Sequence, residues 1–273
     1  MQASAGGRLV GYEDSGTGLP LLLLHAFPLH RRMWAPQLTG LCGRARCIAP
    51  DLRGFGESPP EPPYTMDRYA DDAVALLDAI GVAEPAVVCG LSLGGYIAFA
   101  MWRRHPDRIR GLILADTRAT ADTPEGAEKR HETIALVRQA GSAAVGERQA
   151  SALLSPHTLQ RTPEMLERVK AMIAAQPPEA IAGATDAMLG RPDSTPTLAT
   201  ITVPTLIIVG EDDGITPPDV AEAMRRAIPG SRLERIRHAG HLSNLERPAA
   251  FNGVVAEFLE ELGARTKERG GRS

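Results

Sequence analysis

The sequence predicts an α/β protein whose mostly parallel sheet has helices on both faces and carries an inserted helical segment. Short apolar runs without apolar–polar alternation are typical of strands that are buried on both faces. Five such runs occur along the chain: Leu21–Leu24, Cys47–Ala49, Ala86–Leu91, Leu112–Ala115 and Leu206–Val209. Helical patterns lie between them, and this alternation of strand and helix favours right-handed crossovers in one sheet.

Apolar spacing places three helices of this fold. Residues Tyr69–Ile80 have one apolar face, and Gly81 follows as a stop signal. Residues Leu93–Arg104 begin directly after the third strand run. Near the C-terminus, apolar residues recur at helical spacing over Phe251–Leu262, and Gly263 is expected to end that helix. The polar, glycine-containing stretch that follows is expected to be a frayed end.

Residues 118–196 break the alternation, because they contain helical patterns and no strand-like apolar run. The expected helices are Pro124–Gln139, Ala143–Leu154, Pro163–Gln176 and Pro178–Leu189, with each leading proline in a first turn. Ligands of α/β sheets bind at the carboxyl ends of the strands, where such an insertion must emerge. We therefore expect residues 1–117 and 197–273 to form the core, and 118–196 to form a helical cap.

Composition narrows the classes of partner. The 273 residues carry 30 Lys and Arg against 33 Asp and Glu, and this mild acidity argues against a nucleic-acid partner. No apolar run approaches the roughly 20 residues that span a membrane. No signal peptide is visible, so we expect a cytoplasmic protein. The three cysteines, Cys42, Cys47 and Cys89, match neither a disulfide framework nor a common metal spacing, and we expect no metal.

The segment Gly90-Leu91-Ser92-Leu93-Gly94 matches the pattern G-x-S-x-G. It lies between a predicted strand and a predicted helix, which is the context of a nucleophile elbow. The tight turn needs small flanking residues and exposes Ser92 next to a helix N-terminus. The backbone N–H of Leu93 is then expected to face a developing oxyanion. The alternative is a glycine-rich turn in which Ser92 only caps the helix.

A serine hydroxyl needs a base to become a nucleophile. In this architecture the chain order is serine, then an acid after a late strand, then a histidine before the last helix. Residues that satisfy this order are Glu211, Asp212 and Asp213 for the acid, and His238 and His241 for the base.

Four blocks together carry a resemblance to a known family. They are His25-Ala26-Phe27-Pro28, residues 51–58, the elbow, and Gly240-His241 with residues 244–248 behind it. With them the chain resembles the α/β-hydrolase superfamily from about Leu9 to Leu262. It is most similar to small capped esterases, cofactor-free haloperoxidase-like perhydrolases and 3-oxoadipate enol-lactonases. Ala26 stands where the family usually has glycine.

The resemblance assigns roles within the site. It implies Ser92 as nucleophile, His241 rather than His238 as base, and Asp213 rather than Asp212 as the acid that orients the base. It also implies that the backbone N–H of Phe27 joins that of Leu93 in an oxyanion hole. No cofactor is implied.

Four further polar residues are expected to be structural. Asp116, after another strand run, is a less favoured acid and is expected to cap a turn. His25 is expected to be a buried, hydrogen-bonded residue near the oxyanion loop. The block that contains Asp51 and Arg53 is expected to support the loops of the site.

These residues predict a serine hydrolase that cleaves a small carboxylic ester or lactone through an acyl-enzyme. One alternative is a perhydrolase, in which hydrogen peroxide accepts the acyl group. Another is a non-catalytic binding protein on the same fold, which an intact triad disfavours. Serine at position 92, rather than a carboxylate, disfavours epoxide hydrolase and haloalkane dehalogenase chemistry. The expected partner is a small-molecule substrate, with no nucleic acid or membrane involved; the sequence makes no prediction of oligomeric state.

Overall fold

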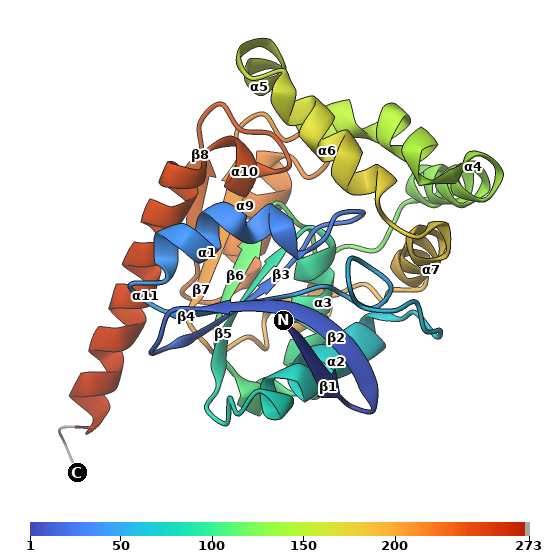
Figure 1. Cartoon of the computed structure of the whole chain (residues 1–273). Coiled ribbons are helices and arrows are strands. Elements are labelled where there is room, and N and C mark those ends of the chain that lie inside the picture. Colours follow the sequence, from blue (N-terminus) through green and yellow to red (C-terminus); the bar gives the residue numbers. More distant parts are fainter. Residues whose placement is uncertain (271–273) are drawn as a thin grey trace.

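The computed structural model describes residues 1–270, with the side chains of residues 1–264. Its centre is an eight-stranded, mostly parallel sheet in the order β1-β2-β4-β3-β5-β6-β7-β8 (Figure 1). The strands are β1 (Gln2–Ala5), β2 (Arg8–Ser15), β3 (Pro20–Leu24), β4 (Arg46–Pro50), β5 (Ala86–Leu91), β6 (Ile109–Ala115), β7 (Thr205–Gly210) and β8 (Arg232–Ile236). The pairs β1–β2 and β2–β4 are antiparallel, and the other pairs of neighbouring strands are parallel.

The five predicted strands are the buried centre of this sheet, β3 to β7. In β3, β5 and β7 every residue is buried, which explains their continuous apolar sequence. The three strands that the sequence did not predict lie at or near the edges. Their side chains are mostly half-exposed or exposed, so they lack the apolar run that identified the others.

Helices cover both faces of the sheet (Figure 1). On one face α1 packs against α11, while on the other α2 packs against α3. The helices outside the insert are α1 (Ala35–Leu41), α2 (Met66–Ala79), α3 (Leu93–Arg104), α9 (Pro218–Ala227), α10 (Ser243–Glu246) and α11 (Pro248–Gly270), with short 3-10 turns at η1 (Arg31–Trp34) and η2 (Pro106–Arg108).

A cap-like helical insert lies between β6 and β7, beyond one end of the sheet (Figure 1). It contains α4 (Pro124–Gln149), η3 (Ala150–Leu153), α5 (Pro156–Arg161), α6 (Glu164–Ala174) and α7 (Pro178–Leu189), followed by the short α8 (Thr195–Leu198). Gly141 has φ 79° and breaks α4 into two helical pieces, as the gap between the first two predicted helices indicates. The sequence did not predict α5. Pro163 precedes α6 as its N-cap, so the first-turn position expected for it was wrong.

The predicted end of the last helix was also wrong. Helix α11 passes through Gly263 and continues to Gly270. A glycine inside a helix costs only about 1 kcal/mol, and the residues that follow it are mostly good helix formers. Much of the expected frayed end is therefore helical, and its last residues, 271–273, lie outside the described residues. No helix of the described chain is long and apolar enough to cross a membrane.

Candidate active site

Ser92 occupies a sharp turn between β5 and α3. Its φ is 55°, in the left-handed region that residues other than glycine rarely adopt. Two hydrogen bonds hold the turn against the end of β6: Ser92 N donates to the Ala115 carbonyl at 3.0 Å, and Thr117 Oγ1 donates to the Ser92 carbonyl at 2.9 Å. The side chain is thus fixed at the carboxyl end of the strand, and Ser92 stays half-buried.

Close backbone approach explains the glycines of the motif. A Cβ atom on Gly90 would lie 2.1 Å from the carbonyl oxygen of Gly94, and one on Gly94 would lie 2.2 Å from that of Leu24. Both separations are far below a van der Waals contact. The elbow can therefore form only where these two positions carry no side chain, as the motif predicts.

His241 lies on the loop that connects β8 to α10, and its ring bridges two other residues. Its Nε2 is 2.8 Å from Ser92 Oγ, and its Nδ1 is 2.9 Å from Asp213 Oδ2. Both His241 and Asp213 are only 2% exposed. The structure therefore brings the three predicted residues into one hydrogen-bonded chain that reaches the half-exposed serine from the interior.

Asp213 follows β7, and its carboxylate is saturated with donors. Oδ1 accepts the backbone N–H groups of Ile215 (2.8 Å) and Thr216 (3.0 Å), while Oδ2 accepts the Thr216 hydroxyl at 2.6 Å and faces His241. Burial alone would raise the pKa of Asp213. The charge of His241 and the bonds from His241 and Thr216 outweigh burial and lower that pKa below its usual value. The group is therefore a carboxylate at neutral pH.

The competing acid and base lie away from this chain. Asp212 is exposed, and its backbone N–H donates to the Ala239 carbonyl. His238 is exposed, has φ 57°, and stacks on His157 of the insert with ring centroids 4.7 Å apart. In the described part of the chain, the ring that is hydrogen-bonded to Ser92 is that of His241, and the carboxylate bonded to this ring is that of Asp213. The geometry thus brings together the residues that the family pattern favoured.

The two expected oxyanion donors come from separate segments. Leu93 is the first residue of α3, where backbone N–H groups lack intrahelical partners. Phe27 is half-buried and follows β3. Within the described chain, neither N–H donates to another backbone or side-chain group. Among described residues other than glycine, φ is positive only at Ser92, Asp116 and His238, so Ala26 does not need the left-handed conformation that favours glycine.

His25 supports the segment that carries Phe27. It is completely buried, with Nδ1 2.9 Å from the Ala26 carbonyl and Nε2 3.0 Å from the Leu52 backbone N–H. These partners require a neutral ring with the proton on Nδ1. Burial lowers the pKa of His25 from 6.5 to about 3, so the ring stays neutral at physiological pH. The structure thus places His25 as a link between two loops.

The block at residues 51–58 braces the same region. Asp51 Oδ1 accepts the Arg31 backbone N–H at 2.9 Å, its other oxygen pairs with the Arg31 guanidinium, and Oδ2 accepts the Glu57 N–H at 2.7 Å. Arg53 pairs with Asp72 of α2 at 2.6 Å. Both residues therefore hold loops together, as expected from their block.

Asp116 has a different role from the one that the sequence predicted. The sequence suggested a turn cap, but its completely buried carboxyl joins two loops of the site. Oδ1 accepts the Gly210 backbone N–H at 2.8 Å, and Oδ2 is hydrogen-bonded to the Ser243 hydroxyl, two residues after His241. Burial, and then the nearby charge of Asp213, raise the pKa of Asp116 well above its ordinary value.

Sequence reasoning missed two polar residues of the site, Thr216 and Glu246. Thr216 donates to Asp213 and lies three residues after it, a local spacing that could have suggested an Asx-type turn. Glu246 accepts the N–H of Gly240 at 2.7 Å. Glu246 belongs to a block that matches the family, but the sequence alone does not predict that it binds the Gly240 N–H.

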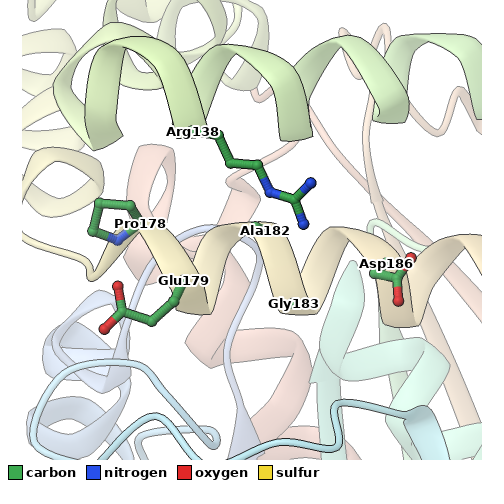
Figure 2. A pocket seen from close by; sticks show the side chains of 6 residues that line it. All are labelled: Arg138, Pro178, Glu179, Ala182, Gly183 and Asp186. Carbon is green, nitrogen blue, oxygen red and sulfur yellow. The ribbon is translucent and has the colours of Figure 1, made fainter.

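A separate groove of about 540 Å³ lies on the insert, between α4 and α7. Figure 2 shows its lining: Arg138, Pro178, Glu179, Ala182, Gly183 and Asp186. None of these residues belongs to the chain Ser92–His241–Asp213. Among the described residues, no group of three or more His, Cys, Asp or Glu side chains is placed to hold a metal ion.

With this geometry established, comparison with known proteins defines the class. Residues 20–248 match the family model described as the alpha/beta hydrolase fold. The chain belongs to the α/β-hydrolase family.

Its relatives include both esterases and lactonases. A thermophilic esterase from Thermogutta terrifontis, in a malate-bound structure, is 42% identical with a TM-score of 0.92, over 96% of this chain and 98% of that one. The enol-lactonase from Burkholderia xenovorans is 29% identical with a TM-score of 0.87, over 95% and 100% of the two chains. The 3-oxoadipate enol-lactonase 2 of Acinetobacter baylyi is 30% identical over 88% of each chain. The chain is thus similar to hydrolases of two kinds of carboxylic ester.

Proposed function

We propose that the protein is a serine hydrolase that cleaves a small carboxylic ester or lactone through an acyl-enzyme. The observation that carries the proposal is the continuous hydrogen-bonded chain from Ser92 through His241 to Asp213. A nucleophile, a base and an orienting acid at these separations are the arrangement that acyl transfer requires. The similarity to esterases and enol-lactonases supports the same substrate class.

In the proposed reaction, Ser92 Oγ attacks the carbonyl carbon while His241 Nε2 takes its proton. Asp213 holds the imidazole by Nδ1 and stabilises the imidazolium that forms. The negative charge of the tetrahedral intermediate develops on the former carbonyl oxygen, which the N–H groups of Phe27 and Leu93 are proposed to bind. Loss of one such donor typically lowers turnover about 100- to 1,000-fold.

The leaving oxygen then takes the proton from His241 as the carbon–oxygen bond breaks. An ester releases its alcohol at this point, whereas the alkoxyl group of a lactone remains attached to the acyl chain. Water attacks the acyl-enzyme with His241 again acting as base, and the carboxylic acid leaves. Each proton that His241 accepts is returned, so the cycle needs no other reactant.

The test combines labelling with a substrate panel. A fluorophosphonate probe should modify Ser92, located by peptide mass spectrometry, and p-nitrophenyl esters and small lactones should be hydrolysed. Ser92→Ala should lose both signals and retain its melting temperature. Labelling at another serine, or hydrolysis that survives Ser92→Ala, would refute the proposal.

A further inference from the structure

The loop that carries His241 is hydrogen-bonded to the cap-like insert both before and after the histidine in sequence. Directly after the histidine, Leu242 N donates to the carbonyl of Leu153 in η3 at 3.2 Å. Before it, the carbonyl of His238 lies 3.2 Å from the Ser155 hydroxyl, at the start of α5. The backbone around the proposed base therefore packs directly on residues 153–155.

Glu246 joins these two segments through one carboxylate. Its Oε1 accepts the backbone N–H of Gly240 at 2.7 Å, and its Oε2 accepts that of Ser155 at 2.8 Å. Gly240 is the residue immediately before His241, and Ser155 belongs to the insert. Bonds from N–H groups to a carboxylate are stronger than neutral ones, so this bridge is the strongest of the contacts between loop and insert.

The backbone of Gly240 lies so close to the insert that position 240 has no room for a side chain. A Cβ atom on Gly240 would lie 2.6 Å from the Ser155 nitrogen and 2.8 Å from the Leu154 carbonyl carbon. On the other side, a Cβ atom on Gly210 would lie 2.2 Å from the Gly240 oxygen. The loop is thus held between the end of β7 and the insert, and a shift of residues 153–155 must move it.

We propose that Glu246 is a positioning residue for the base: it binds the His241 loop to the insert and thereby holds His241 in place. This inference rests on the proposed function, because it assigns catalytic work to His241. It also distinguishes two parts of the insert by what they contact. Residues 153–155 would determine the placement of the base, while the remainder of the insert would be free to select substrate.

Two variants break the bridge from opposite sides. Glu246→Gln keeps the side-chain length but retains only one acceptor oxygen, so one of the two N–H groups loses its partner. Ser155→Pro removes the donor on the insert. Ser155 has φ −67° and Leu154 is extended, with φ −119° and ψ 148°, so the backbone already suits a proline at position 155.

Matched controls separate the bridge from other effects. Ser155→Ala keeps the N–H but loses the hydroxyl, which caps α5 by accepting the Thr158 N–H at 3.1 Å. Comparison of the proline with the alanine variant therefore reports the loss of the N–H together with the displacement of the Glu246 carboxylate by the proline ring, and both effects break the bridge. Glu257→Gln makes the same chemical change on α11, at a side chain that is 71% exposed.

The measurements are kcat and KM for p-nitrophenyl acetate, butyrate and octanoate, the rate of fluorophosphonate labelling, and the melting temperature. A misplaced base should lower kcat and labelling by about ten- to a hundredfold in Glu246→Gln and Ser155→Pro. The loss should be equal for all three esters, with KM little changed. Glu257→Gln should keep the wild-type kcat. Ser155→Ala keeps the bridge but loses the hydroxyl bond to the His238 carbonyl, so it should lose less kcat than Ser155→Pro. The double variant should be no slower than the slower single one, because both changes interrupt the same bridge between the loop and the insert.

Other outcomes would overturn the proposal. If Glu246→Gln and Ser155→Pro melt at lower temperature but keep the wild-type kcat and labelling rate, the bridge is only structural. If they change KM in a manner that depends on acyl length, the bridge acts on substrate selection. A wild-type protein that is not labelled at Ser92 would refute the proposed function itself, and this inference with it.

Discussion

Lowering the pH from 7 to 5 should destabilise the protein by about 2 kcal/mol through His25 alone. Burial lowers the pKa of this histidine from 6.5 to about 3 in the folded state. The unfolded state therefore binds the proton first, and the contribution of His25 to stability is complete above pH 6.5 and is lost as the pH falls toward 3. Each pH unit within that window is worth about 1.4 kcal/mol, and most of the 1.5 units between 6.5 and 5 counts in full.

Urea unfolding at pH 7 and pH 5 tests this magnitude. The wild type is compared with His25→Gln, whose amide can still accept the Leu52 N–H but does not titrate in this range. We expect the variant to be less stable at pH 7, but to lose about 2 kcal/mol less than the wild type when the pH is lowered. The other histidines are common to both proteins, so their effects cancel in the comparison. Equal losses in the two proteins would show that His25 is protonated without cost and would refute its buried, neutral state.

Three further predictions concern the site and the insert. Asp213→Asn should lower kcat by about 10⁴-fold, because an amide facing Nδ1 favours the wrong tautomer of the base. Asp212→Asn should have little effect. The opposite ranking of the two variants in a steady-state assay would reassign the acid. Asp116→Asn should retain most of the activity, since a neutral amide can still accept from one loop and bond to the other; a loss as large as that of Asp213→Asn would show that the charge of Asp116 is needed. Met172→Ala, on α6 of the insert, should change the ratio of kcat/KM between p-nitrophenyl acetate and octanoate while the labelling rate of the serine stays unchanged, and a flat ester profile would contradict a role in selection.

The sequence predicted those parts of the fold that have a local physical signature. A strand such as β5 is buried over its whole length, so all of its residues are apolar and the run is visible. Strand β8 has the sequence RLERI and only one buried residue, and its identity depends on pairing with β7. The end of α11 depends on the balance of helix propensity around Gly263, which a single glycine does not decide.

The same distinction applies to the site. Ser92 could be predicted because the elbow is a contiguous segment, and the chain order then limited the base and the acid to a few residues. The partners of Glu246 could not be predicted, because Ser155 is 91 residues away and contributes only a backbone N–H. Any residue except proline offers that donor, so the contact leaves no trace in the identity of residue 155.

The buried carboxyls of Asp116 and Asp213 show how the surroundings, rather than the residue type, suit one of them to orient a base. Asp213 receives three donors from its own turn and faces His241, and these interactions lower its pKa despite burial. Asp116 has one backbone N–H and one hydroxyl as partners, and burial and the charge of Asp213 raise its pKa. The surroundings thus shift the pKa values of two neighbouring acids in opposite directions, which suits them to different roles. Asp116 joins the loops of Gly210 and Ser243, whereas Asp213 is the carboxylate that His241 faces.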